Sequence, residues 1–178
     1  MLVVVAAELL QTIRESEAWA SDYLDIHGVR FDLHEELRQI TLHAYSLRKV
    51  TLDLGDHPSG DTPEALRARA AFDARLEILA GVWDGLVDRV ATIHRFNANL
   101  TELDEQLSNL RALQRAKTAD DSIAELLRNT AGDELGAEHH RGLANEIAEL
   151  KALIASVLGQ LRGDLHEIGR MRINNPEL

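Results

Sequence analysis

The placement of proline limits what this chain can fold into. The sequence has three prolines, Pro58, Pro63 and Pro176, and two of them lie within six residues of each other. Proline removes a backbone N–H and clashes with the preceding helical turn, so it interrupts helices. Residues 1–54 and 64–175 contain none and are rich in Leu, Ala, Glu and Arg, which favour helix. The sequence therefore predicts an all-α protein with one clear interruption.

The composition favours a helical bundle over a sheet sandwich. Aromatic residues make up only 4% of the 178 residues, so the core is built from Leu, Ile, Val and Ala. Cysteine is absent, which excludes disulfides and cysteine zinc sites. The net charge of −11, with no long run of Lys and Arg, argues against broad nucleic-acid binding. Arg outnumbers Lys sixteen to three, which indicates a high-GC genome and fits a bacterial source.

Hydrophobic periodicity predicts an up-down bundle of four long helices and one short helix, forming a single domain over residues 1–178. Apolar residues recur at steps of three and four, the spacing of a coiled-coil-like seam. The expected helices cover about residues 2–26, 31–54, 62–117, 122–130 and 138–171. The seam of the longest helix contains Phe72, Leu76, Leu79, Trp83, Leu86, Val90, Ile93, Phe96, Leu100, Leu103, Leu107 and Leu110.

The longest predicted helix contains an irregularity near residue 97. Two consecutive spacings between apolar residues are three residues each, instead of alternating three and four, and Asn97 and Asn99 lie at this point. A skipped residue of this kind locally overwinds a coiled coil, and Asn can cap a new helix. We favour one continuous helix with a bend, and two separate helices are the alternative.

The third and fifth predicted helices are longer than the first two, which predicts an extended two-helix arm. A bare arm exposes its seam and would need a partner, most simply a second copy of the chain in a homodimer. The interface candidates are the seam residues of this arm: Leu100, Leu103, Leu107, Leu110, Leu143, Ile147, Leu150 and Ile154.

The chain begins with an apolar stretch at residues 2–7. It lacks the basic residues of a signal peptide and is too short to span a bilayer. We interpret it as the first turns of a buried helix, with an anchor or a partner-covered interface as the alternative. No transmembrane segment is expected, and the expected location is cytoplasmic.

No motif typical of metal or nucleotide chemistry occurs in the sequence. Glu-x-x-His, His-Glu-x-x-His and His-x-x-x-His are all absent, as are glycine-rich phosphate loops and Gly-x-Ser-x-Gly. The densest histidine cluster is Glu138-His139-His140, but adjacent histidines on a helix point about 100° apart. We therefore expect neither a metal site nor a cofactor.

Two segments place an Arg and a His five residues apart. The pairs are Arg89 with His94, and Arg38 with His43, and an aromatic residue follows each. This spacing resembles the Arg-(four to six residues)-His signature of HEPN-type helical ribonucleases. The resemblance implies that the Arg and His of two subunits meet at a dimer interface and cleave RNA without metal. The cation would hold the phosphate and the imidazole would transfer the proton.

Three functions remain after these observations. The favoured one is a non-enzymatic helical interaction protein, a scaffold or adaptor, that self-associates through its heptad seams and also binds an unidentified protein. The first alternative is a sensory four-helix bundle that binds a small ligand between its helices. The second is a HEPN-like, metal-independent ribonuclease that uses one of the Arg–His pairs.

Overall fold

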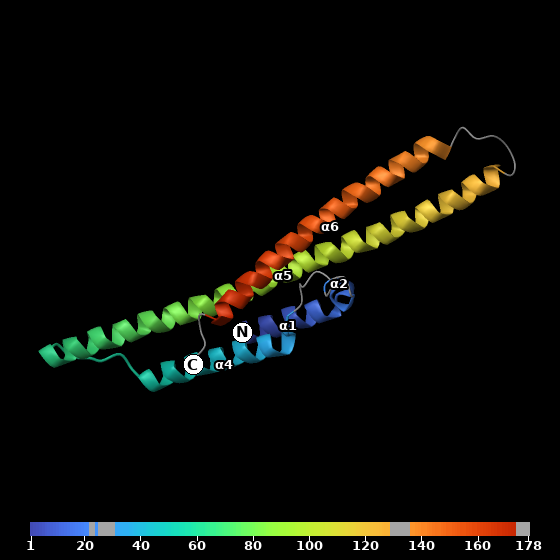
Figure 1. The fold of residues 1–178 in the computed structure, drawn as a ribbon. Coiled ribbons are helices and arrows are strands. Elements are labelled where there is room, and N and C mark those ends of the chain that lie inside the picture. The colour runs from blue at the N-terminus through green and yellow to red at the C-terminus, as the bar shows by residue number, and fades with distance from the viewer. Residues whose placement is uncertain (22–23, 25–30, 129–135, 174–178) are drawn as a thin grey trace. The chain divides into compact units, whose positions relative to one another are not determined.

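The chain folds as an all-α bundle (Figure 1). The computed structural model describes residues 1–21, 24, 31–128 and 136–173. Within these ranges there are five helices and no strand, which confirms the predicted fold class. None of these helices is long and apolar enough to cross a membrane. The helices are α1 (Leu2–Glu15), α2 (Glu17–Ala20), α4 (Leu33–Leu54), α5 (Pro63–Arg128) and α6 (Gly136–Ile173).

The first predicted helix, 2–26, is wrong in its extent because α1 ends at Glu15. Ser16 has an extended backbone and caps α2, where its side chain accepts a hydrogen bond from the Trp19 backbone N–H at 3.1 Å. Serine favours this capping position because its hydroxyl satisfies a backbone donor that the helix leaves unpaired. Residues 22–23 and 25–26 of the predicted helix lie outside the described residues.

Helix α5 is continuous over 66 residues, through residue 97 and beyond residue 117. The separate short helix predicted at 122–130 is therefore wrong as far as Arg128, because that segment is the end of α5. The side chains of Thr118 and Ser122 bond back to carbonyl groups four residues earlier, each at 3.0 Å, so neither acts as a cap. This back-bonding is compatible with a helix interior.

The described chain packs as two compact units. The first unit comprises Met1–Arg14, Phe31–Asn97 and Asp164–Leu178, and the second comprises Glu15–Arg30 and Ala98–Gly163. Long helices α5 and α6 each contribute a segment to both units.

A hairpin of α4 and the first half of α5 forms the frame of the first unit. Its connecting loop is fastened to α5: the His57 imidazole bonds the Asp73 carboxylate at 3.1 Å, and Arg69 donates to the Pro58 and Gly60 carbonyls. The core of this unit contains Ala6, Leu10, Ile13, Ile40, Leu86, Val90, Ile93, Phe96 and Ile168.

The second unit is built around the far halves of α5 and α6. Two polar contacts attach α2 to α5: the Ala18 backbone N–H donates to Asp104, and Arg111 donates to Glu17 at 2.7 Å. The core of this unit contains Ala18, Leu24, Leu100, Leu103, Leu107, Leu150, Ile154, Val157, Leu158 and Leu161. Five of them, Leu100, Leu103, Leu107, Leu150 and Ile154, are predicted seam positions of α5 and α6, so the chain itself closes the seam there.

Candidate functional site

A buried ion pair joins α4 to α5 in the first unit. Arg89 donates from Nε to Glu36 Oε1 at 2.6 Å and from Nη2 to Glu36 Oε2 at 3.0 Å. Arg89 is 3% exposed and Glu36 is 0% exposed. Two parallel hydrogen bonds between a guanidinium and a carboxylate are strong and directional. The pair therefore fixes how α4 and α5 align at this position.

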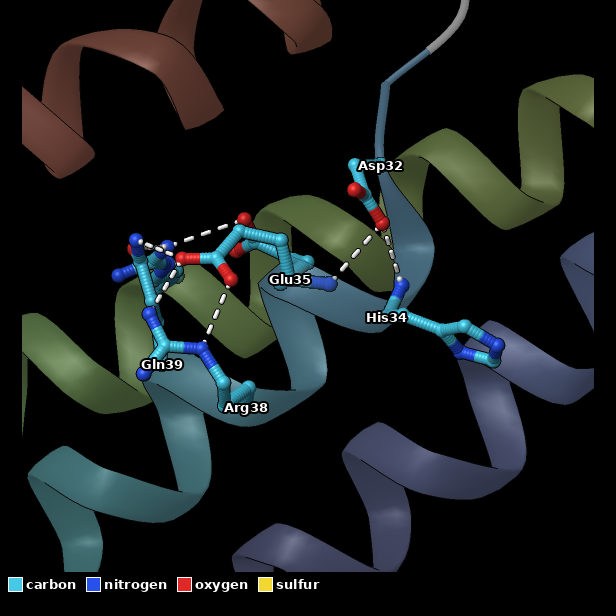
Figure 2. A network of polar contacts seen from close by, with 7 residues as sticks. Asp32, His34, Glu35, Arg38 and Gln39 are labelled. Carbon is cyan, nitrogen blue, oxygen red and sulfur yellow. Dashed lines mark hydrogen bonds and ion pairs between the residues drawn. The ribbon is translucent and has the colours of Figure 1, made fainter.

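A polar network connects this pair to the surface (Figure 2). The second Nη2 hydrogen bond of Arg89 goes to Gln39 Oε1 at 3.0 Å, and Gln39 donates to Glu35 Oε1 at 2.7 Å. Arg38 also binds Glu35, through Nε and Nη2 at 2.7 Å each, and this hydrogen bonding raises the pKa of Arg38. Asp32 caps the same helix by accepting from the backbone of Glu35 and of its neighbour. These contacts link successive residues in the N-terminal turns of α4.

His43 and Arg89 line a hollow of about 420 Å³ in the first unit. His43 is half-buried, and its burial is the largest cause that lowers its pKa. The positive charge of Arg89 lowers this pKa further, and the negative charge of Glu36 opposes the shift. The environment of His43 therefore favours the neutral imidazole. The residues that line the hollow are His43, Ile78, Gly81, Val82, Gly85, Leu86, Arg89 and Met171.

Within a single chain, the Arg and the His of each sequence-predicted pair do not lie together; the resemblance places them on two subunits. Arg89 is buried against Glu36, whereas His94 is exposed; Arg38 is exposed and bound to Glu35, whereas His43 is half-buried. Residues five apart on a helix differ by about 140°, which separates the members of each pair. The structure instead brings Arg89 together with His43, one residue from each motif.

Sequence reasoning missed Glu36, Gln39 and the glycines of the hollow. A signal for Glu36 was present, because it lies three residues after Leu33 and four before Ile40, inside the apolar face of α4. A charged residue at such a position needs a partner. No sequence pattern identified Arg89 as that partner, because 53 residues separate the two.

A second ion-pair cluster holds the end of α6 to α5 in the first unit. Arg95 binds the buried Asp164 at 3.2 Å and Glu167 at 2.5 Å. The hydrogen bond that Arg95 donates to Asp164 is the largest cause that raises the pKa of Arg95. This cluster positions the last turns of α6, including Met171, beside the hollow.

Most of the sequence-predicted interface candidates are buried within the second unit. Leu100, Leu103, Leu107, Leu150 and Ile154 are between 0% and 8% exposed. Leu110 and Ile147 are half-buried. The side chain of Leu143 lies outside the described residues. Little of the surface of the five buried residues remains for a partner.

Exposed apolar side chains concentrate instead in the first unit. Along the α5 seam, Leu76 and Trp83 are 39% and 44% exposed, whereas Leu86 is 5% exposed and Ile93 is 0% exposed. We call the uncovered region the open end of the hairpin. It comprises residues 42–54 and 63–84, with exposed Leu42, Tyr45, Val50, Leu52, Leu66, Leu76, Ile78 and Trp83.

Among the residues that the structure describes, no group of three or more His, Asp or Glu side chains is placed to hold a metal ion. The side chains of Glu138, His139 and His140 fall outside that description. No protein-family model matches the chain, and no curated protein or solved structure matches it either. The fold and the site define the class: an all-α bundle with a buried ion-pair network beside a small hollow.

Proposed function

We propose that this chain is a helical interaction protein that self-associates through the open end of the α4–α5 hairpin. The observation that supports it is the change in burial along one seam of one helix. The seam of α5 is covered at Leu86, Val90 and Ile93 and is half-exposed at Leu76 and Trp83. Figure 1 shows the loop-side ends of α4 and α5 extending beyond α1 and the end of α6 within the first unit.

The α4–α5 hairpin does not close this part of the seam, because Leu76 and Trp83 remain exposed. Further helices would cover these side chains, as in a four-helix bundle. Two hairpins packed against each other supply four helices with one symmetric contact. Tyr45 and Trp83 suit this role because aromatic residues are enriched at protein interfaces.

The charge of the open end favours a second copy as its partner. Residues 42–54 and 63–84 carry five Lys and Arg against five Asp and Glu, a net charge of zero, whereas the whole chain carries −11. Two copies therefore repel each other less at this end than over the rest of the surface. A scaffold or adaptor role for an additional protein is part of the same proposal and would use the faces that the dimer leaves uncovered.

Light scattering across about a hundredfold dilution tests this proposal, since association depends on concentration. The wild-type chain is expected to have the mass of a dimer at high concentration. The double variant Leu76→Glu with Trp83→Glu should be a folded monomer, because it places charge on the seam. Ala74→Glu is the matched control: it is exposed on the same helix but off the seam, and it should remain dimeric. A monomeric wild type, or a dimeric double variant, would overturn the proposal.

The ribonuclease alternative receives less support from the geometry. Its chemistry needs an arginine available to phosphate, and Arg89 already binds Glu36 and Gln39. An RNA-cleavage assay of the chain and of its His43→Ala and His94→Ala variants addresses it. Cleavage that is lost in either variant would favour the ribonuclease over the interaction protein.

A further inference from the structure

We propose that the hollow of the first unit binds a small amphipathic monocarboxylate. The carboxylate would lie against Arg89 and His43. The apolar part would lie over Ile78, Val82 and Met171.

Arg89 has hydrogen-bond donors left for a ligand. A guanidinium carries five N–H groups, and those on Nε and Nη2 bind Glu36 and Gln39. Within the described part of the chain, Nη1 of Arg89 donates no hydrogen bond. No fully buried side-chain nitrogen or oxygen in those residues lacks a partner, so Nη1 must reach solvent. Since Arg89 is otherwise buried and lines the hollow, its two Nη1 hydrogens are available there.

Two glycines give the hollow its depth. Gly81 and Gly85 lie one turn apart in the interior of α5, where glycine is less favourable than alanine. A Cβ added at either position would meet nothing within 4 Å. Packing within the described chain therefore does not require glycine there. The space above both residues is accessible to a ligand.

The charges of the site select the ligand class. Glu36 balances the charge of Arg89, so among the described lining residues His43 is the group that can gain a positive charge when an anion binds. The site can thus balance one negative charge, which suits a monocarboxylate better than a doubly charged phosphate. Most of the remaining wall is apolar, from Ile78, Val82, Leu86 and Met171. The volume of about 420 Å³ lies within the range of about 300–1,000 Å³ typical of small-molecule sites.

The hollow overlaps the open end of the hairpin at His43, Ile78, Gly81 and Val82, but it lies on a different face of α5 from the seam residues Leu76 and Trp83. At about 100° per residue, Val82, Gly85 and Arg89 share one face of α5, and Leu76 and Trp83 lie on a face roughly opposite. A ligand in the hollow does not need the dimer. This site and the self-association can therefore fail independently in experiments.

Methyl NMR with octanoate as the probe tests the proposal directly. The chain has two methionines, Met1 and Met171, and only Met171 lines the hollow. Titration of protein labelled with carbon-13 at the methionine methyl groups should shift the Met171 signal until saturation and leave Met1 unchanged. Octanol, which has the tail without the carboxylate, should bind at least about tenfold more weakly, the loss expected for one hydrogen bond to a charged group.

A variant whose added side chain fills the hollow tests whether octanoate binds there, and a second glycine variant is its control. Gly85→Leu should lower octanoate affinity at least about tenfold while the helical content and the mass in solution remain those of the wild type. Gly159 is exposed on α6, and a Cβ added there also meets no atom within 4 Å, so Gly159→Leu should bind octanoate as the wild type does. The proposal is overturned by an unshifted Met171 signal, by equal binding of octanol, or by full binding in Gly85→Leu. It is also overturned if Gly85→Leu changes only the mass, since the hollow would then belong to a protein contact.

Discussion

The first unit buries polar and charged side chains, Glu36, Arg89, Thr92 and Asp164, whereas every buried side chain described in the second unit is apolar. Both units use helices with the same three-and-four spacing. A buried bidentate ion pair is satisfied in one alignment only, so it fixes how two helices pair. A leucine seam tolerates more alignments because hydrophobic contact is not directional. The comparison indicates that the first unit has a precisely set geometry beside its hollow.

The units also differ in how completely they cover their seams. In the second unit Leu103 is fully buried by the chain, and in the first unit Leu76, on the same helix, is 39% exposed. The same apolar pattern thus forms an internal core in one place and leaves a surface in the other. We therefore assign self-association to the open end of the hairpin.

Breaking the buried ion pair is expected to have the largest effect. Glu36→Leu alone should lower the free energy of unfolding by about 3–5 kcal/mol, because Arg89 would keep a buried charge without its partner. The double variant Glu36→Leu with Arg89→Leu should return close to wild-type stability, since both charges are removed. Urea unfolding measures both. A single variant that costs less than about 1 kcal/mol would show that the pair is not buried as described.

Truncating one leucine in each unit sharpens the difference in coverage. Leu103→Ala should cost about 3 kcal/mol, because it leaves a cavity in a packed core. Leu76→Ala should cost about 1 kcal/mol at protein concentrations low enough for the monomer, because its side chain is already partly in water. Equal costs for the two variants in urea unfolding would contradict the difference in burial.

Replacing glycine by alanine should change the free energy of unfolding in opposite directions at the hollow and at the turn that ends α4. Gly85→Ala should raise the free energy of unfolding by about 0.5–1 kcal/mol, because it improves helix propensity and meets no atom. Gly55→Ala should lower it, because Gly55 ends α4 at a φ of +71°, where a Cβ is strained. Thermal unfolding compares the two. A destabilised Gly85→Ala would mean that the space at the hollow is already filled.

The smallest expected effect is a change in pH dependence at His43. Its pKa is lowered in the folded chain, so the unfolded chain binds the proton more readily and stability falls as the pH drops below the ordinary value of 6.5. The charged groups that act on it are Glu36 from α4 and Arg89 from α5, and α6 contributes the uncharged Met171. His43→Asn should therefore lose less stability than the wild type between about pH 7.5 and about pH 5.5. Identical losses in urea unfolding would contradict this account.

Periodicity and proline placement were sufficient to predict the all-α fold and most helix positions, because both depend on local sequence. The sequence did not predict the break at Ser16 or the continuity of α5 through Ser122. The hydroxyl of Ser16 caps a new helix, whereas that of Ser122 bonds back to the preceding turn, and local sequence does not distinguish these two roles. The site depended on Arg89 meeting Glu36 and His43 from another helix. The sequence identified Arg89 and His43 as candidates, but it assigned them to different pairs, because spacing along one helix does not show what the next helix presents.

Hydrogen–deuterium exchange at high and low protein concentration tests the central claim, that the open end of the hairpin is the surface of self-association. Backbone amides within residues 42–54 and 63–84 should exchange more slowly at high concentration, because a second copy covers them. Amides of the second-unit core, from Leu100 to Leu107 and from Leu150 to Leu161, should exchange equally at both concentrations, since the chain already buries them. Slowing confined to the second unit, or no dependence on concentration at all, would contradict the claim.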